Sequence, residues 1–379
     1  MKYYIIAGEA SGDLHGSNLM KGLKAEDEQA DFRIWGGDLM EAEGGQLVKH
    51  YRDLAFMGFW EVLKNIRTIL GNIKMCKRDI LVYQPDVLIL IDYPGFNLRI
   101  AKWAKAQGIR VFYYISPQIW AWHSSRVHGI KASVDRMFVI LPFERDFYAK
   151  YDYEVDFVGH PLMDVVEAFE APVDFITVHQ LKDAPIIALL PGSRKQEIER
   201  LLNVMLSIVP DFPGYQFVIA GAPSQERAFY ERVIQQSPLS KEASERVHFT
   251  DNQTYALLQH AEAALVTSGT ATLETALFEV PQVVCYKGSS LSYYIARQVV
   301  NVDYISLVNL IANREIVREL IQGDCNPERI REELSAILAG GDRRESMKAD
   351  YDALKNQIGQ GGASRKAARL MVQYAQSEG

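Results

Sequence analysis

The sequence predicts an α/β protein built from two doubly wound domains. Short apolar runs alternate with helical patterns along all 379 residues, and two similar glycine turns follow such runs in the second half. A chain of this length exceeds the size at which one hydrophobic core keeps growing, so two domains are expected. Continuous apolar strands are typical of a parallel sheet whose two faces are covered by helices.

The predicted strands are short and mostly apolar throughout. They are Tyr3–Ala7, Phe32–Gly36, Val87–Asp92, Arg110–Ile115, Arg136–Val139, Ile186–Leu190, Gln216–Ala220, Val247–Phe249, Ala263–Thr267 and Gln282–Tyr286. Helical periodicity lies between them, as in Ser17–Glu26, Leu98–Ala106, Gln196–Ile208 and Thr272–Phe278. This alternation predicts a doubly wound pattern that runs twice.

The seam between the domains is expected near Glu170–Ala184, where neither period is sustained. We therefore place one Rossmann-like domain at residues 1–172 and a second at residues 173–379. From Pro327 on, the sequence predicts helices that end the second domain or pack back on the first. In such folds ligands bind in the cleft at the carboxyl ends of the strands.

The bulk composition narrows the class of protein. The net charge of −7 and the lack of a long basic block argue against nucleic acid as a partner. The three cysteines form no CxxC pair, so we expect neither a disulfide framework nor a zinc site. The N-terminus opens directly on a strand and every apolar run is shorter than a membrane span, which predicts a cytoplasmic protein.

A first glycine turn in the second half predicts a phosphate site. Residues Ile186 to Glu197 read IIALLPGSRKQE, an apolar strand followed by a turn and a helix start. Backbone N–H groups at such a start attract anions, and the Arg194 guanidinium beside Gly192 and Ser193 can hold a phosphate bidentately. The alternative is a simple helix start capped by Ser193, with Glu197 as its capping-box glutamate.

A second turn of the same design lies in the segment AALVTSGTATLE. Ser268, Gly269 and Thr270 surround its helix start, and the Glu274 carboxylate is placed to accept hydrogen bonds from both hydroxyls of a ribose. Simple capping is again the alternative, but two such turns in one half of the chain favour a nucleotide diphosphate. No GxGxxG or GxxxxGK[ST] turn is present, which argues against a dehydrogenase or a P-loop protein.

Polar groups cluster after two strands of the first half. The segment AGEASGDLHG offers Glu9, Ser11, Asp13 and His15, and the alternative is that Ser11 or Asp13 caps a helix starting near Leu14. In LILIDYPGFN, Asp92 follows an apolar strand and is expected at the mouth of the cleft. Partial desolvation would raise its pKa and suit a general base. The other reading is a cap for a helix starting at Asn97. Glu9, Asp13 and His15 remain alternative bases.

Three further groups of residues each allow both a functional and a structural interpretation. Asn309, in the segment YISLVNLIAN, is expected to bind the base or sugar of a nucleotide or to be a buried structural asparagine. Trp120 and Trp122 offer flat walls for a sugar ring or simply pack. His160 is a lone histidine before a proline, which is more often structural than catalytic.

Residues Phe56–Arg78 predict a surface for lipid. Apolar residues recur at the spacing of one helical face: Phe59, Leu63, Ile66, Leu70 and Ile73. With the basic residues among them, we expect this segment to lie on an anionic membrane or to line a path for acyl chains. The expected lipid contacts are Phe56, Met57, Phe59, Trp60, Leu63, Lys64 and Arg67. The alternative is an ordinary helix that covers the sheet, because it needs the same stripe.

Eight motifs follow one another along nearly the whole chain. They are GEASGD at 8–13, FMGFWEVL at 56–63, IDYPGFN at 91–97, SPQIWAW at 116–122, LPFE at 141–144, GHP at 159–161, LLPGSR at 189–194 and SGTATLE at 268–274. Together they resemble the lipid-A-disaccharide synthase family, inverting glycosyltransferases with the GT-B fold. One departure is Gly95, where the family often has an aspartate, and it leaves Asp92 as the stronger candidate base.

The resemblance implies a reaction and a set of roles. UDP-2,3-diacylglucosamine donates its sugar to 2,3-diacylglucosamine 1-phosphate, giving a β(1→6) tetraacyl disaccharide phosphate and UDP, in lipid A biosynthesis of a Gram-negative cell. Asp92 would remove the acceptor's proton. Glu9, Ser11 and Asp13 would orient the acceptor, with Trp120 and Trp122 as its walls, and the two turns would hold UDP.

The resemblance also bears on cofactors and location. No metal ion and no other cofactor is implied. The lipid substrates imply a peripheral protein on the cytoplasmic face of the inner membrane, and a homodimer with exchanged C-terminal parts is allowed. Two rival functions remain: a UDP-sugar 2-epimerase, which needs no lipid surface, and a non-catalytic nucleotide-sugar binder, which does not need Asp92.

Overall fold

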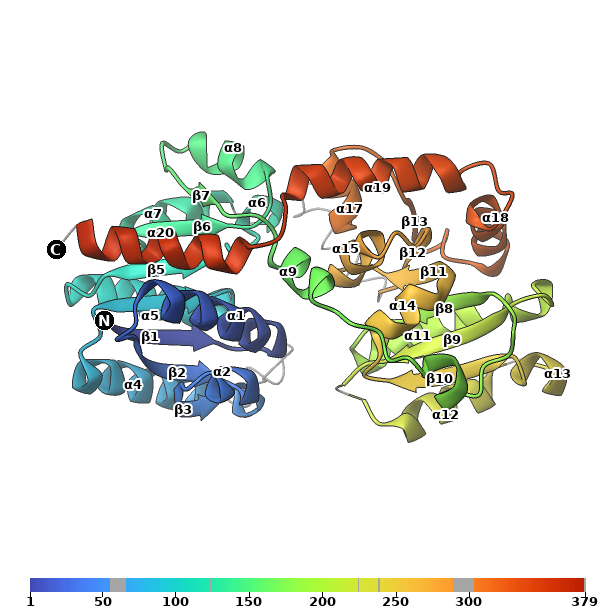
Figure 1. The fold of residues 1–379 in the computed structure, drawn as a ribbon, viewed down its shortest axis with the longest axis horizontal. Coiled ribbons are helices and arrows are strands. Elements are labelled where there is room, and N and C mark those ends of the chain that lie inside the picture. The colour runs from blue at the N-terminus through green and yellow to red at the C-terminus, as the bar shows by residue number, and fades with distance from the viewer. Residues whose placement is uncertain (55–65, 123, 224, 238, 289–302, 378–379) are drawn as a thin grey trace. The chain divides into compact units, whose positions relative to one another are not determined.

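The computed structural model describes residues 1–54, 66–122, 124–223, 225–237, 239–288 and 303–377. The chain divides into two compact units, one formed by Met1–Asp164 with Ile358–Gly379 and the other by Val165–Gln357 (Figure 1). The first crossing precedes the segment 170–184 in which we expect the seam, and a second crossing returns the end of the chain to the first unit. Each unit holds a parallel sheet with helices, so the predicted α/β class is confirmed.

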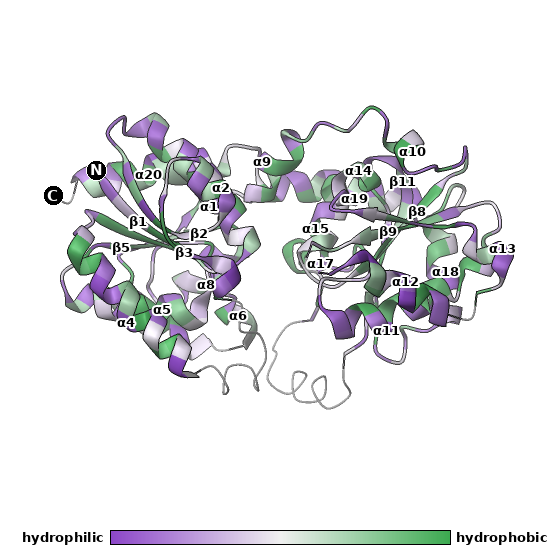
Figure 2. Ribbon diagram, turned by 90° about the horizontal axis from the view of Figure 1, so that it is seen from below, coloured by the Kyte–Doolittle hydropathy of each residue, from purple (hydrophilic) through white to green (hydrophobic). Residues whose placement is uncertain are grey.

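The first unit contains a seven-stranded sheet in the order β3-β2-β1-β4-β5-β6-β7. All of its pairs are parallel. Its strands are β1 (Lys2–Ala7), β2 (Asp31–Gly36), β3 (Gln46–His50), β4 (Val87–Ile91), β5 (Val111–Tyr114), β6 (Arg136–Val139) and β7 (Asp156–Phe157). Figure 2 shows most of these strands in green between helices that carry both colours, as expected for a sheet covered on its faces.

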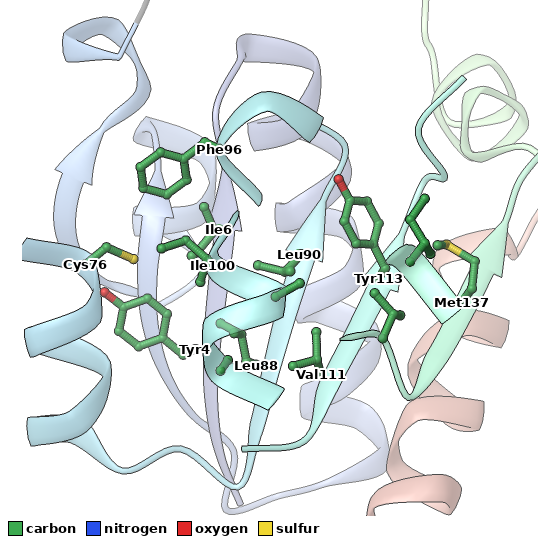
Figure 3. Packing of buried hydrophobic residues seen from close by; sticks show 14 of the residues in the cluster. Tyr4, Ile6, Cys76, Leu88, Leu90, Phe96, Ile100, Val111, Tyr113 and Met137 are labelled. Carbon is green, nitrogen blue, oxygen red and sulfur yellow. The ribbon is translucent and has the colours of Figure 1, made fainter. Parts of the chain in front are cut away.

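The helices of the first unit include the last helix of the chain. They are α1 (Ala10–Glu26), α2 (Asp38–Ala42), α4 (Ile66–Tyr83), α5 (Pro94–Ala106), α6 (Ile119–Trp122), α7 (Val127–Ser133), α8 (Phe143–Ala149) and α20 (Ala363–Ser377), with α9 (Pro161–Glu167) at the first crossing. One core lies between the sheet and helices α4 and α5, where Tyr4 and Leu88 from the strands meet Cys76 and Ile100 from the helices (Figure 3).

Helix α20 packs on α1. Gly22 of α1 faces Ala368, whose Cβ would lie only 2.8 Å from a Cβ on the glycine. The carboxylate of Asp164 accepts hydrogen bonds from the backbone N–H groups of Gly362, Ala363 and Ser364, so it caps α20 across the return crossing. The terminal helix is therefore an integral part of the first unit.

The second unit contains a six-stranded parallel sheet in the order β10-β9-β8-β11-β12-β13. Its strands are β8 (Ile186–Leu190), β9 (Gln216–Gly221), β10 (Val247–Asp251), β11 (Ala261–Thr267), β12 (Gln282–Tyr286) and β13 (Arg318–Ile321). Its helices are α10 (Phe175–Val178), α11 (Lys195–Leu206), α12 (Arg227–Gln236), α13 (Lys241–Ser244), α14 (Thr254–His260), α15 (Thr270–Leu277), α17 (Leu307–Ala312), α18 (Pro327–Ile337) and α19 (Arg344–Ile358), which reaches the return crossing.

Candidate active site

A cavity of about 410 Å³ lies at the carboxyl ends of β4 and β5 in the first unit. Asp92 directly follows β4, and Ile115 directly follows β5, so two neighbouring parallel strands bring them to one edge of the sheet. The lining residues are Asp92, Pro94, Ile115, Ser116, Pro117, Gln118, Ile119 and Arg126. The cavity thus unites the IDYPGFN and SPQIWAW motifs.

The backbone around this cavity is strained. Asp92, Tyr93 and Ile115 have φ of 44°, 48° and 64°, a region that side chains rarely adopt and β-branched ones least of all. The turn is held in place because the Asp92 carbonyl accepts hydrogen bonds from the Asn97 amide at 2.8 Å and from the Tyr113 hydroxyl at 2.5 Å. Strain of this kind persists where the surroundings enforce it, and it concentrates at functional sites.

The Asp92 carboxyl has a raised pKa. Burial raises it from 3.8, and the negative charge of Glu9 raises it further, to about 6. The group is therefore ionised at neutral pH and basic enough to accept a proton from a hydroxyl. The alternative that Asp92 caps a helix starting at Asn97 is wrong, because α5 begins at Pro94 and its N-cap is Tyr93.

The GEASGD segment lies beside this edge. Glu9 is the N-cap of α1, and both Glu9 and Ser11 are exposed. Gly8 touches the ring of Tyr93, since a Cβ there would lie 2.3 Å from Tyr93 Cγ. The turn after β1 therefore packs against the turn after β4 and places Glu9 where its charge acts on Asp92. The acceptor-binding roles of Glu9 and Ser11 remain predictions.

Asp13 caps a neighbouring helix. Its buried carboxylate accepts hydrogen bonds from the backbone N–H groups of Gly37 at 2.7 Å, Leu39 at 3.1 Å and Met40 at 3.1 Å, at the start of α2. The expectation that it caps its own helix is wrong, because α1 already begins at Ala10. Both oxygens are engaged, so we infer that Asp13 shapes the site by holding this turn.

Two histidines of the first unit are buried and neutral. Burial lowers the pKa of His15 to about 4, and burial and His15 lower that of His160 to about 3. His160 accepts a hydrogen bond on Nδ1 from the Leu162 backbone N–H at 3.2 Å, which favours the structural interpretation. A base with a pKa near 4 is poorly matched to neutral pH, so Asp92 is the better candidate than His15.

The tryptophans of SPQIWAW lie in α6. The ring of Trp120 packs edge-on against Phe143, with ring centroids 4.9 Å apart. Trp120 is thus at least partly a packing residue. Trp122 is the last residue of α6, and its side chain lies outside the described part of the structure. Both sugar-wall roles remain predictions.

In the second unit, the PGSR turn leads from β8 into α11. Gly192 has φ of 105°, and a Cβ on it would lie 2.3 Å from Oε2 of Glu197. Ser193 and Arg194 are exposed, and Arg194 rather than Ser193 is the N-cap of α11, with no side-chain cap. Burial raises the pKa of Glu197, and the positive charge of Arg194 lowers it in part. The expected glutamate is thus folded back on the turn, while the Arg194 guanidinium faces solvent.

The SGT turn leads from β11 into α15. Ser268 Oγ donates a hydrogen bond to the Ile305 carbonyl at 2.8 Å, which ties the turn to the segment before α17. Gly269 has φ of 140° and is the N-cap, again with no side-chain cap. Gly269 and Thr270 are exposed. An uncapped helix start with exposed small residues is the geometry expected of an anion site.

Glu274 lies one turn into α15. It accepts a hydrogen bond on Oε1 from the Tyr255 hydroxyl at 2.7 Å. Burial raises its pKa, and the Tyr255 hydrogen bond opposes that effect. One carboxylate oxygen is therefore engaged with the protein, and the contact of Glu274 with a ribose remains a prediction. Tyr255 was not identified from the sequence, because it lies on a different helix, α14.

Asn309 is a buried structural residue. Its amide donates to the Val317 carbonyl at 2.8 Å and to Glu319 at 2.9 Å, and its oxygen accepts from the Ile316 and Val317 backbone N–H groups. Glu319 also accepts from the backbone N–H of Ile305 at 2.9 Å. Asn309 therefore supports the segment that Ser268 contacts, and its predicted contact with the nucleotide gains no support.

Most of the expected lipid surface lies outside the described residues: Phe56, Met57, Phe59, Trp60, Leu63 and Lys64. Helix α4 carries the remainder. Ile73, Cys76 and Ile80 face the core, as the sheet-covering alternative requires. Leu70, which the predicted stripe included, is 54% exposed, and Arg67 beside it is also exposed.

Two features are absent from the described residues. No described helix is long and apolar enough to cross a membrane. Within the same residues, no group of three or more His, Cys, Asp or Glu side chains is arranged to hold a metal ion.

Comparison with solved structures defines the class. The chain is 13% identical to the UDP-GlcNAc 2-epimerase from Neisseria meningitidis bound to UDP-GlcNAc, with a TM-score of 0.68 over 98% of this chain and 100% of that one. It is 13% identical to the glycotransferase of kitacinnamycin, with a TM-score of 0.67 over 98% of each chain. At this identity the likeness shows the fold alone, and that fold is the predicted GT-B class.

Comparison with families is more specific. A model described as lipid-A-disaccharide synthetase matches residues 3–373. The chain belongs to this family and is a glycosyltransferase. Lipid-A-disaccharide synthases from Syntrophus aciditrophicus and Nitrosococcus oceani are 42% and 40% identical to it, over 97% and 99% of this chain and 96% of each relative.

Proposed function

We propose that this enzyme transfers diacylglucosamine from UDP to the 6-hydroxyl of 2,3-diacylglucosamine 1-phosphate. A family membership that covers residues 3–373 supports the UDP-sugar donor and the lipid acceptor. The observation that carries the chemistry is the carboxyl of Asp92, which lines a cavity and whose pKa is raised to about 6. A group of this kind suits removal of a proton from an alcohol.

In this proposal the first unit holds the acceptor and the base. Asp92 accepts the proton of the 6-hydroxyl as its oxygen attacks the anomeric carbon of the donor, and UDP leaves from the opposite face of the sugar. Glu9 and Ser11 orient the acceptor; both lie at the N-terminal end of α1 and are exposed. The negative charge of Glu9 keeps the pKa of Asp92 high and so makes it a better base.

The second unit holds UDP. Arg194 with its turn and the start of α15, which no side chain caps, bind the diphosphate, and Glu274 binds the ribose. These groups stabilise the negative charge that develops on the leaving diphosphate, since donors fixed in advance cost no reorganisation during the reaction.

The lipid substrates require a membrane surface. We propose that the exposed side of α4, with Arg67, Leu70, Lys74 and Arg78, contributes to peripheral binding at the cytoplasmic face of the inner membrane. Flotation with vesicles containing phosphatidylglycerol tests this, and binding that R67Q/K74Q/R78Q leaves unchanged would contradict it. The resemblance also allows a homodimer, which sedimentation of the purified protein tests.

The decisive assay uses the purified protein, both lipid substrates and a chelator, with UDP and disaccharide followed by mass. We expect disaccharide and UDP in equal amounts. Release of UDP without disaccharide would indicate hydrolysis or an epimerase-like elimination. UDP-sugar binding without any product, from protein with an intact fold, would indicate a non-catalytic binder.

A further inference from the structure

The cavity that holds Asp92 also holds an arginine. Arg126 lines it together with Ser116 and Gln118. Its side chain is exposed, and it forms no ion pair or hydrogen bond with another described residue. Arg126 was not identified from the sequence, because it lies after the end of the SPQIWAW motif at 116–122.

Two other arginines of the first unit are engaged with carboxylates. Arg33 pairs with Asp79 at 2.7 Å, and Arg52 pairs with Asp38 at 2.9 Å. Arg126 has no such partner in the described chain, so its five N–H donors are available to a ligand. The cavity therefore presents an unused cation.

Arg126 is not the counter-ion of Asp92. The pKa of Asp92 is set by burial and by the charge of Glu9, and both raise it, with no opposing effect from the guanidinium. The backbone of Arg126 is anchored, because it is the N-cap of α7, whose Val127 and Ile130 are buried. One cavity thus holds a base and a separate, positioned cation.

We propose that Arg126 binds the phosphate monoester of the sugar acceptor while Asp92 accepts the proton from its hydroxyl. The inference rests on the proposed function, which supplies an acceptor that carries both groups. A planar guanidinium donates two parallel hydrogen bonds to a phosphate, which gives orientation as well as affinity. The cavity volume of about 410 Å³ lies in the range of small-ligand sites, about 300–1,000 Å³.

Direct binding tests the subsite without turnover. Calorimetry with glucosamine 1-phosphate and with glucosamine compares ligands that differ by the phosphate. We expect R126Q to weaken binding of glucosamine 1-phosphate about 10- to 100-fold, the range of hydrogen bonds between charged groups, and to leave glucosamine unchanged. R145Q is the control, because Arg145 is exposed in the same unit and does not line the cavity. Equal losses in R126Q and R145Q would overturn the proposal.

Steady-state kinetics separates this inference from the proposed function. The acceptor and its analogue without the 1-phosphate are compared in the wild type, R126Q and R126K. If the wild type forms disaccharide, we expect R126Q to lower kcat/KM for the phosphorylated acceptor alone, with the donor KM unchanged and partial recovery in R126K. An equal loss for both acceptors, or a rise in the donor KM alone, overturns the role of Arg126 and leaves the transferase intact. A wild type that forms no disaccharide overturns both.

Discussion

Gly8 and the ring of Tyr93 are in direct contact, since a Cβ on Gly8 would lie 2.3 Å from Tyr93 Cγ. Only a hydrogen fits between them. The contact joins the turn after β1 to the strained turn after β4, and so it brings Glu9 to the catalytic candidate Asp92. A glycine in the first motif thus has a role in the geometry of the third.

We expect Gly8→Ala to push Tyr93 out of place, lower stability by about 1–3 kcal/mol and reduce activity, because an added methyl group overfills a packed site. Urea unfolding and the disaccharide assay measure the two effects. Gly95→Ala is the matched control, because nothing lies within 4 Å of a Cβ at that position. A G8A variant with the stability and activity of G95A would show that the contact is unimportant.

Asp92→Asn is expected to lower kcat about 10²- to 10⁴-fold, the usual contribution of a general base. In the wild type, kcat/KM should rise with pH through about 6 as the Asp92 carboxyl ionises. A profile that is flat between pH 5 and pH 8 would exclude Asp92 as the base.

Asp92→Asn should also change how the stability of the protein depends on pH. The folded-state pKa of Asp92 is raised from 3.8 to about 6, so the folded protein holds this proton more tightly than the unfolded chain. Stability therefore falls as pH rises through this window, and the penalty is complete above about pH 6. We expect D92N to raise Tm at pH 8 and to change it less at pH 4. A larger rise in Tm at pH 4 than at pH 8 would contradict the burial of the Asp92 charge.

Asp13→Ala and Ser11→Ala should separate structure from binding. Loss of the Asp13 carboxylate leaves the backbone N–H groups at the start of α2 without acceptors, which should cost about 3 kcal/mol. Ser11 is exposed and makes no such bonds, so we expect S11A to raise the acceptor KM at unchanged Tm. An S11A variant as unstable as D13A would refute this division.

Glu274→Gln tests the ribose contact. We expect the wild type to bind UDP about tenfold more tightly than 2′-deoxy-UDP, and E274Q to lose this preference, because the charged acceptor is removed. Tyr255→Phe should keep the preference while altering affinity, since Tyr255 holds only Oε1. Glu279→Gln is the control, because Glu279 pairs with Lys355 away from this turn. Calorimetry measures all three.

Arg194→Ala tests the diphosphate contact. We expect UDP affinity to fall about 10- to 100-fold and uridine affinity to stay unchanged, because only UDP carries the charge that a guanidinium binds. Arg200→Ala, an exposed substitution further along α11, serves as the control. If uridine binding weakened as much as UDP binding, Arg194 would have a structural role instead.

Buried strands were predictable from the sequence because they are continuous apolar runs. The predicted bounds Arg136–Val139, Ile186–Leu190 and Gln282–Tyr286 match the observed ones. The strands β3, β7 and β13 were missed. All three lie at sheet edges, where polar residues are tolerated: β13 contains Arg318, which pairs with Glu333, and β7 has only two residues.

Site residues were predictable from the sequence where they directly follow a strand. Asp92 and the two glycine turns follow buried strands, and parallel strands bring such residues to one edge. Roles that depend on distant partners could not be read. The amides that Asp13 binds belong to another helix, as does the hydroxyl that Glu274 accepts from, and no local pattern reveals either.

Because α20 packs on α1, the first unit cannot be completed until α20 leaves the ribosome. Domains ordinarily fold one after another during synthesis, starting from the N-terminus. Here the strands from β1 to β7 are synthesised first. The surface of α1 then stays uncovered while the whole second unit is made. The enzyme should therefore become active only after α20 has been synthesised, and a nascent chain ending at Gln357 would expose the apolar surface that Ala367, Ala368 and Met371 cover.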